Sequence, residues 1–83
     1  MYCIYILKSL KDNKTYVGYT NDLNKRLVLH NSGKVISTKY RIPFVLIFSE
    51  KFLTAKGAKK REIWWKSGSG RKKMKELFFN SRI

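Results

Sequence analysis

The chain has 83 residues, the size of one small domain, which leaves no room for a second hydrophobic core. It carries 19 lysines and arginines against five aspartates and glutamates, a net charge of +14 at pH 7, and its 43% of hydrophobic residues excludes an intrinsically disordered chain. Such a charge favours polyanionic partners, above all nucleic acid, because each neutralised phosphate releases condensed counterions.

The first part of the chain has the pattern of a β-hairpin followed by a helix. Residues 2–7 are β-branched and aromatic, and both faces of their alternation are apolar, which is typical of a central strand. The turn signal at 11–14 makes 15–19 the return strand of a hairpin. Thr20 or Asn21 can cap a helix over about 21–32, with Asp22 in its first turn and Gly33 after its end.

The second part of the chain adds one strand and two helices. A polar and basic loop over 34–42 precedes a third apolar strand at 44–48. Thr54 caps a helix over about 55–66, which residues 67–70 end, and 71–79 form a short third helix with Met74, Leu77 and Phe78 facing inward. The order β-β-α-β-α-α predicts an α+β fold, with a small mixed or antiparallel sheet and helices packed on it.

The sequence also limits the compartment in which the protein works. Cys3 is the only cysteine, which excludes an intrachain disulfide and a cysteine-based zinc site. A reduced, cytoplasmic setting is therefore expected. No run approaches the roughly 18 apolar residues of a membrane span, so no membrane partner is expected.

Two polar residues lie at the border of the apolar face of the first helix. Leu23 and Leu27 define the buried stripe of that helix. Arg26 and His30, which are four residues apart, share one edge of the same side. Each alone would be a structural residue more often than a catalytic one. Together, next to a hairpin that carries tyrosines, they are candidates for a functional site.

Glu62 is the one acidic residue expected to face inward. In the second helix it follows the same apolar face as Ala58 and Trp65. Two interpretations are open. The carboxylate can form a salt bridge with a neighbour such as Lys59 or Lys66, or it can be an oxygen ligand for a hard divalent ion that keeps several waters.

The hairpin carries Tyr5 and Tyr16 within two triplets, Cys-Ile-Tyr at 3–5 and Tyr-Val-Gly at 16–18. With Arg26, His30 and Glu62 following in order, the chain resembles the GIY-YIG nuclease family over essentially its whole length. The resemblance is greatest to the short, stand-alone bacterial members. Further similarities lie at 16–20, 26–33 and 66–71.

The resemblance implies a three-stranded antiparallel sheet flanked by helices and one nuclease domain over 1–83. The implied activity is metal-dependent hydrolysis of phosphodiester bonds. DNA is expected as the substrate more than RNA, with structure or single-strandedness selected more than sequence, because a domain this small has few groups left for reading bases. Tyr16 would deprotonate or orient the attacking water, and Tyr5 would hold that network or the phosphate. Arg26 would stabilise charge on phosphoryl oxygens, and Glu62 would bind one Mg²⁺ or Mn²⁺. His30 would position groups or transfer a proton. Nearby cations would lower the phenol pKa values.

Basic residues of the second helix and the segment after it are expected to form a band that contacts phosphates. Acidic residues are too few for these cations to be engaged mainly in surface ion pairs. The predicted nucleic-acid contacts are Lys56, Lys59, Lys60, Lys66, Arg71, Lys72 and Lys73, and Arg61 and Lys75 extend the band.

Of three departures from the family pattern, the first is expected to cost little, and the other two keep other functions open. The first triplet begins with Cys3 instead of glycine, Tyr19 stands where some relatives have lysine, and 72–75 lack the asparagine that many members carry. One alternative is a nucleic-acid-binding module that keeps the fold and cuts poorly or not at all. Another is a basic structural or ribosome-associated protein. A homodimer through exposed aromatic residues, such as Trp64 or Trp65, is a further expectation.

Overall fold

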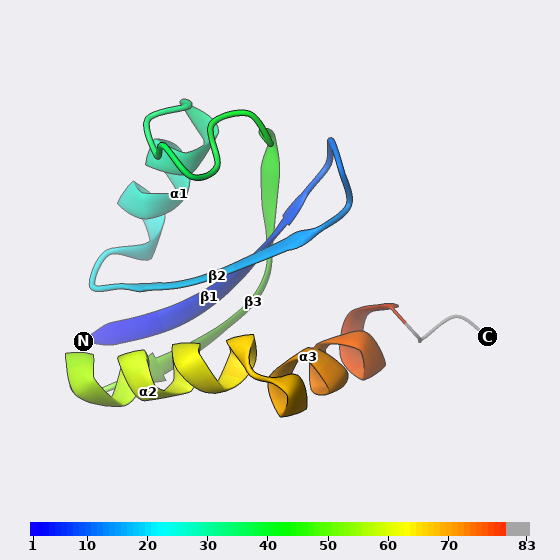
Figure 1. Cartoon of the computed structure of the whole chain (residues 1–83). Coiled ribbons are helices and arrows are strands. Elements are labelled where there is room, and N and C mark those ends of the chain that lie inside the picture. The colour runs from blue at the N-terminus through cyan, green and yellow to red at the C-terminus, as the bar shows by residue number, and fades with distance from the viewer. Residues whose placement is uncertain (80–83) are drawn as a thin grey trace.

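Three antiparallel strands form one sheet in the order β2-β1-β3, so the first strand lies in the middle (Figure 1). The structure, a computed structural model, describes residues 1–79. The strands are β1 (Tyr2–Ser9), β2 (Thr15–Thr20) and β3 (Phe44–Phe52). The third strand is longer than the predicted 44–48, because its polar end continues to pair with β1 as far as Phe52.

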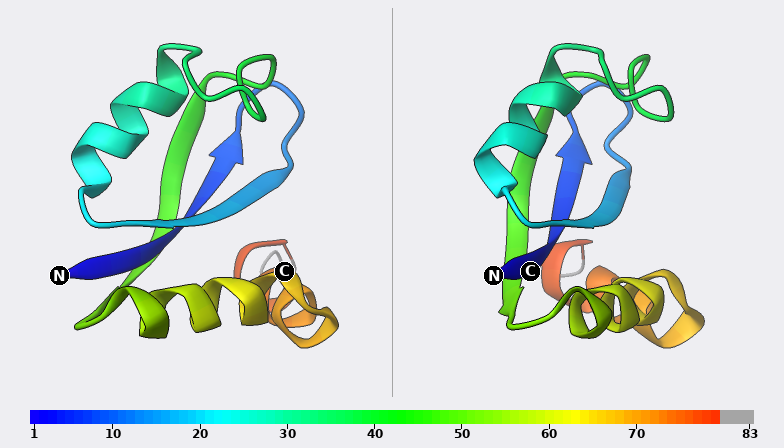
Figure 2. Two further views of the ribbon diagram at one scale, coloured as in Figure 1. Left: turned by 60° about the vertical axis from the view of Figure 1, so that its left-hand side comes forward. Right: turned by 90° about the vertical axis from the view of Figure 1, so that its left-hand side faces the viewer.

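Helices cover both faces of this sheet, as the views in Figures 1 and 2 agree. One face carries α1 (Leu23–Asn31), and the other carries α2 (Ala55–Lys66) followed by α3 (Gly68–Met74) and the π-helical segment η1 (Lys75–Phe79). The α+β class, the antiparallel three-stranded sheet and the order β-β-α-β-α-α are confirmed.

β1 is buried on both faces, as its apolar pattern predicted. Ile4 and Ile6 point towards the core beneath α2, whereas Tyr5 and Leu7 point towards α1. All four side chains are at most 1% exposed. The central strand therefore supplies one apolar cluster on each side of the sheet.

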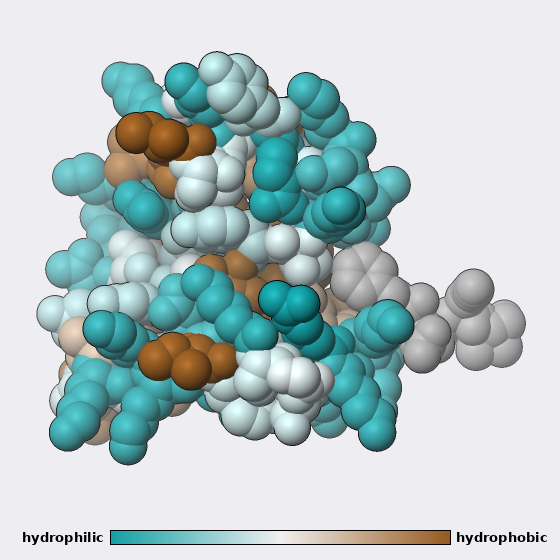
Figure 3. All heavy atoms as spheres, viewed as in Figure 1, coloured by the Kyte–Doolittle hydropathy of each residue, from teal (hydrophilic) through white to brown (hydrophobic). Residues whose placement is uncertain are grey.

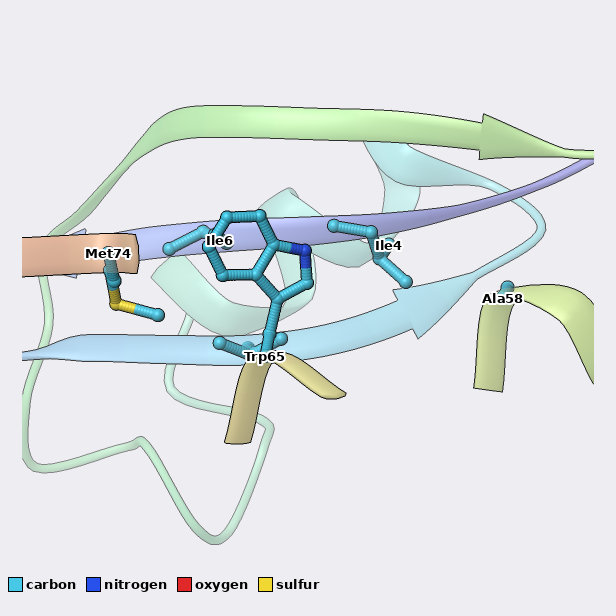
Figure 4. Packing of buried hydrophobic residues seen from close by; sticks show 6 residues of the cluster. Ile4, Ile6, Ala58, Trp65 and Met74 are labelled. Carbon is cyan, nitrogen blue, oxygen red and sulfur yellow. The ribbon is translucent and has the colours of Figure 1, made fainter. Parts of the chain in front are cut away.

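Trp65 of α2 is the centre of the larger cluster. Its indole lies against Ile4 and Ile6 of β1, and Ala58 and Met74 close the two ends (Figure 4). The ring nitrogen also has a partner, because Nε1 donates a hydrogen bond to Glu50 Oε1 at 3.2 Å. A buried tryptophan that satisfies its N–H in this way fixes both the height and the rotation of α2 on the sheet.

Glu50 is shared by a second group from α2. Arg61 Nε donates to Glu50 Oε1 at 2.9 Å, and its guanidinium lies 4.3 Å from the centre of the Trp64 ring. Arg61 is thus committed to a contact with β3 and to a cation–π contact, which corrects its expected place in the basic band. Trp64 is half-buried beneath that guanidinium. The pairing of two copies through an exposed aromatic residue stays a prediction.

Helix α1 begins at Leu23, slightly later than the predicted residue 21. Asp22 is itself the N-cap, since its Oδ1 accepts a hydrogen bond from the Lys25 amide at 3.1 Å. Thr20, one of the expected caps, instead accepts from the Asp22 amide at 3.1 Å. The predicted stop is confirmed, because Gly33 adopts a φ of +78° after the helix, a conformation that favours glycine.

α2 and α3 meet at a single residue. Ser67 ends α2 and also caps α3, so the third helix begins at Gly68 and not at the predicted residue 71. Gly70 is buried at this elbow, where a Cβ atom would collide with the Trp64 carbonyl oxygen and the Trp65 Cα atom. The absence of a side chain at Gly70 therefore allows the close approach of the two helices.

The end of the third helical stretch is wound differently from an α-helix. Met74 is buried and Phe78 packs against the core, as predicted, but Leu77 is 44% exposed. The prediction assumed 3.6 residues per turn, whereas Lys75–Phe79 form a π-helical turn. The wider turn rotates Leu77 away from the sheet.

The loop between α1 and β3 is fastened at both ends. Asn31 accepts from the Phe44 amide at 2.6 Å and donates back to the Phe44 carbonyl at 3.1 Å. Arg41 forms an ion pair with Asp12 of the hairpin turn at 2.9 Å, which lowers the pKa of Asp12 to about 2. These bonds fix the path of residues 34–42 over the sheet end. Among residues 1–79, no helix is long and apolar enough to cross a membrane.

The close approach at Gly70 predicts a large and specific loss of stability on substitution. Gly70→Ala should lower the free energy of unfolding by about 1–3 kcal/mol, because the added methyl meets backbone atoms that cannot move independently. Gly68→Ala is the matched control, since nothing lies within 4 Å of its Cβ position and alanine favours a helix. Urea unfolding monitored by tryptophan fluorescence measures both, and equal stability of the two variants would contradict this account of the elbow.

Candidate active site

Two tyrosines from paired strands meet on the α1 face of the sheet. In the β1–β2 register Tyr5 lies opposite Gly18 and Leu7 lies opposite Tyr16, so the tyrosines are diagonal neighbours. Their ring centres are 6.4 Å apart. The Tyr5 phenol lies over Gly18, where a Cβ would be 2.5 Å from the hydroxyl oxygen. Glycine in the second triplet therefore makes room for the tyrosine of the first.

Helix α1 brings Arg26 and His30 to these phenols. His30 is fully buried, and its Nε2 lies 3.0 Å from the Tyr5 hydroxyl oxygen. Its ring centre is 5.0 Å from that of Tyr16. Arg26 Nε donates to the Tyr5 hydroxyl at 3.4 Å. The structure thus brings together Tyr5, Tyr16, Arg26 and His30, as their expected places in the fold implied.

A fifth residue, Thr38, completes this group from the loop before β3. Its hydroxyl oxygen is 2.8 Å from His30 Nδ1, and the hydroxyl donates to the Val35 carbonyl at 3.5 Å. Like His30, Thr38 is fully buried. The sequence analysis missed it, because a threonine in a polar loop gives no periodic signal and its contact depends on the path of the loop.

These contacts assign the protons of the chain of hydrogen bonds. The Tyr5 oxygen accepts from Arg26, so the phenol proton is available for His30 Nε2. His30 then carries its own proton on Nδ1 and donates it to Thr38, which donates onward to Val35. Only in this arrangement does every donor have an acceptor among the contacts present. His30 is thus a neutral imidazole with its Nε2 lone pair directed at Tyr5.

The electrostatics agree with that assignment. Burial lowers the pKa of His30, and the charge of Arg26 lowers it further, so the ring stays neutral at pH 7. Burial raises the pKa of Tyr5 despite the opposing hydrogen bond from Arg26. Arg26 thus lowers the pKa of Tyr5, as expected of a nearby cation, but burial outweighs it. The hydrogen bond to Tyr5 raises the pKa of Arg26, and Tyr16 adds to that effect.

Glu62 approaches the same site from α2. Its charge contributes to the raised pKa of Tyr5, which places the carboxylate within electrostatic range of the phenol. Its Oε2 atom accepts from Lys66 Nζ at 3.0 Å, and the side chain is 17% exposed. The ion pair with Lys66 is thus present, as the first interpretation held, and the metal-ligand interpretation stays a prediction.

The donor set restricts the kind of metal that could bind. Among residues 1–79 there is no group of three or more histidine, cysteine, aspartate or glutamate side chains that could surround an ion. Glu62 alone fits a hard ion such as Mg²⁺ or Mn²⁺, which binds through one or two carboxylates and completes its shell with water and substrate phosphate. A preformed zinc or calcium cage does not fit these residues.

The predicted basic residues are exposed and separate into two groups. A groove between β2 and the helices α2 and α3 is lined by Lys66, Arg71 and Lys72, and Lys14 and Lys75 join them there. Lys14 was missed by the sequence analysis because it stands in a turn, far along the chain from the others. The remaining predicted contacts are exposed outside this groove: Lys56, Lys59, Lys60 and Lys73.

Comparisons with known proteins agree with this architecture. The family model described as the GIY-YIG catalytic domain matches residues 1–75. The UPF0213 protein YazA of Bacillus subtilis is 44% identical over 79 residues, which cover 94% of this chain and 77% of that protein. A UPF0213 protein of Staphylococcus saprophyticus is 44% identical over 73 residues, with 87% and 88% of the two chains covered.

A solved structure has the same fold. The solution NMR structure of a UPF0213 protein from Bacillus halodurans superposes with a TM-score of 0.55 at 32% sequence identity and covers 98% of this chain and 89% of the other. None of these three names states an activity, so any inference about activity rests on the family and on the site described above.

The role of Thr38 predicts a stability difference between two conservative variants. Thr38→Val leaves the buried His30 Nδ1–H without an acceptor and should lower the free energy of unfolding by about 1–3 kcal/mol. Thr38→Ser keeps the hydroxyl and should retain most of that stability. Urea unfolding measures both. A valine variant as stable as the serine variant would contradict the assigned bond.

Because burial and Arg26 favour neutral His30, we predict that its imidazole has a pKa below that of an ordinary histidine. The imidazole pKa, measured from ring carbon–proton NMR signals, should lie below the ordinary value of 6.5, and Arg26→Gln should raise it because a nearby cation is removed. In the unfolded chain His30 takes up a proton near pH 6.5, whereas in the folded chain it stays neutral until a lower pH. Stability should therefore fall as pH drops from 6.5 towards the folded pKa. A pKa at or above 6.5 would contradict this prediction.

Proposed function

The chain belongs to the GIY-YIG catalytic-domain family, and from that membership we propose that 1–83 act as one metal-dependent endonuclease domain that hydrolyses phosphodiester bonds. The observation that carries the proposal is the hydrogen-bonded group of Arg26, Tyr5 and His30, with Tyr16 beside it and Glu62 within electrostatic range. Nuclease chemistry needs a cation for the phosphoryl charge, a group that orients water and a carboxylate for a metal, and these residues supply all three.

Arg26 is suited to the charge that develops on the phosphoryl oxygens. Its bond to Tyr5 uses only the Nε proton of a guanidinium that has five N–H donors. Tyr16 also bonds to this guanidinium, and the N–H groups that remain can bind a phosphate. A planar guanidinium matches two phosphoryl oxygens better than an ammonium group does. Positioned charge of this kind contributes without reorganisation during the reaction.

Tyr16 is the proposed group for the attacking water. It is half-buried, and it stands on the edge strand beside the basic groove. The His30 ring packs against it edge to face and fixes its orientation. From this position the phenol oxygen would orient the water, and it would accept the proton of the water only after it has lost its own.

Tyr5 and His30 are proposed to work as a pair. Tyr5 is protonated at neutral pH because its pKa is raised, and its proton is held towards His30. The pair would keep Arg26 in place and let a proton move between the Tyr5 oxygen and His30 Nε2 when charge changes nearby. The neutral state of His30 at pH 7 leaves that nitrogen free to accept a proton.

Glu62 is the proposed protein ligand of one Mg²⁺ or Mn²⁺ ion. Bound there, such an ion would polarise a phosphoryl oxygen and stabilise the leaving oxygen. The exposed lysines of α2 and α3 add a sequence-independent attraction for the backbone, so we expect selection by nucleic-acid structure and a preference for DNA. The unpaired Cys3 suits a reduced, cytoplasmic setting.

One observation favours a second candidate function. The ion pair between Lys66 and Glu62 occupies the carboxylate that a metal would need. A protein that kept this pair permanently closed would bind nucleic acid without cutting it. The two candidates share the same surface and differ in whether Glu62 can exchange its partner.

Cleavage of plasmid and branched DNA by the purified protein with Mg²⁺ or Mn²⁺ tests the proposal. Glu62→Gln should slow cleavage at least about 100-fold, the scale of losing one group that stabilises transition-state charge, because the amide is a poor metal ligand. Glu76→Gln is the matched control, since this exposed carboxylate lies on η1. Equal rates for wild type and Glu62→Gln would contradict the metal role. Salt-dependent binding without cleavage would favour the second candidate.

A further inference from the structure

A groove of about 910 Å³ runs along the free edge of the sheet. One wall is β2, which is an outer strand, and the other is formed by the end of α2 together with α3 and η1. Its floor is apolar, with Val17 and Met74, and the Thr15 hydroxyl donates to the Met74 sulfur at 3.1 Å across the base. In Figure 3 apolar atoms lie between the level of β2 and that of α2, with hydrophilic side chains around them.

The polar lining of the groove has one sign of charge. Lys14 comes from the hairpin turn, Lys66 from α2, Arg71 and Lys72 from α3, and Lys75 from η1. No aspartate or glutamate is among the described residues that line it. A low-dielectric floor beneath converging cations strengthens their attraction for an anion that enters.

The size of the groove decides between two forms of nucleic acid. Its volume is within the roughly 300–1,000 Å³ of pockets that enclose a small ligand, which suits a few linked nucleotides. The same volume is too small to enclose both strands of a duplex, whose backbones are separated by grooves about 12 Å and about 6 Å wide. We propose that this groove binds the phosphates of one unpaired nucleic-acid strand next to the scissile bond, and that Lys66 moves from Glu62 to a phosphate when the strand enters.

Two residues join the groove to the catalytic group. Tyr16 belongs to the edge strand that lines the groove, and its ring packs against His30 on the α1 face, so a strand in the groove would lie beside the residue that carries the proposed water-orienting phenol. Lys66 lines the groove and also holds Glu62. A strand that follows the cations would therefore contact β2, which carries Tyr16, and Lys66, which holds Glu62.

Lys66 cannot form a close ion pair with Glu62 and with a strand phosphate at the same time. Its Nζ atom lies 3.0 Å from Glu62 Oε2, on the carboxylate that a divalent ion would use. A strand phosphate offers Lys66 another anion, and the transfer leaves Glu62 with an uncompensated charge that favours a cation. Strand binding and metal binding are then coupled, and the coupling acts equally in both directions. This part of the proposal rests on the proposed function of Glu62.

The strand site is tested without metal, so that cleavage plays no part. In EDTA, fluorescence anisotropy follows binding of six-nucleotide DNA and RNA strands and of a DNA duplex at several salt concentrations. The double variant Arg71→Gln/Lys72→Gln should weaken single-strand binding and lower its salt slope by about 1.4, at about 0.7 for each lost phosphate contact. The stronger of the DNA and RNA strands identifies the source of the phosphates.

The control removes equal charge elsewhere. Lys25 and Lys34 are exposed and do not line the groove, so Lys25→Gln/Lys34→Gln should leave the salt slope nearly unchanged. Equal losses in the two double variants, or duplex binding that suffers as much as single-strand binding, would overturn the strand site. Single-strand binding without any cleavage would support the strand site and contradict the proposed nuclease. Cleavage that Arg71→Gln/Lys72→Gln leaves unchanged would support the nuclease and contradict the strand site.

The transfer of Lys66 has its own measurement. Manganese binding to the protein alone, followed by electron paramagnetic resonance, should be about two- to fivefold tighter in Lys66→Met than in Lys72→Met, the scale of a surface ion pair. Both variants remove one positive charge from the groove, but only Lys66 contacts Glu62. Equal affinities in the two variants would overturn the transfer.

Discussion

The burial of β1 on both faces is the constraint on which the rest of the molecule depends. Successive side chains of a strand point to opposite faces, so the same eight residues must support α2 on one side and build the tyrosine group on the other. Ile4 and Ile6 hold Trp65, and Tyr5 holds His30. Because the two tasks alternate along one strand, a shift of register would exchange core and site at once.

The few carboxylates of this chain are placed where they organise structure. Asp12 fastens the loop before β3, Asp22 caps α1, and Glu50 joins β3 to α2 through Arg61 and Trp65. With five acidic residues against 19 lysines and arginines, most of the positive charge cannot pair with a carboxylate of the same chain. Charge repulsion therefore acts mainly among exposed side chains, where salt and an anionic partner relieve it.

The sequence was sufficient for the elements whose pattern is local. The alternation in β1 and the cap at Thr54 predicted a central strand and the start of α2, and both are confirmed. Leu77 was placed wrongly because a π-helical turn cannot be distinguished from an α-helical one by apolar spacing. The grouping of Tyr16, Arg26 and His30 followed from family resemblance, which locates residues that lie far apart in the chain. Thr38 was out of reach, since its contact with His30 is set by bonds at both ends of a loop.

The outer position of β2 has a consequence for solubility. An outer strand presents unpaired backbone groups to which another chain can add, and natural proteins oppose such association with lysines along the edge. In this chain the groove beside β2 brings Lys14, Lys66 and Lys72 to that edge. If a second copy approached β2 with its own outer strand, the cations of the two copies would repel each other. The same residues that attract a polyanion therefore also oppose aggregation of the protein.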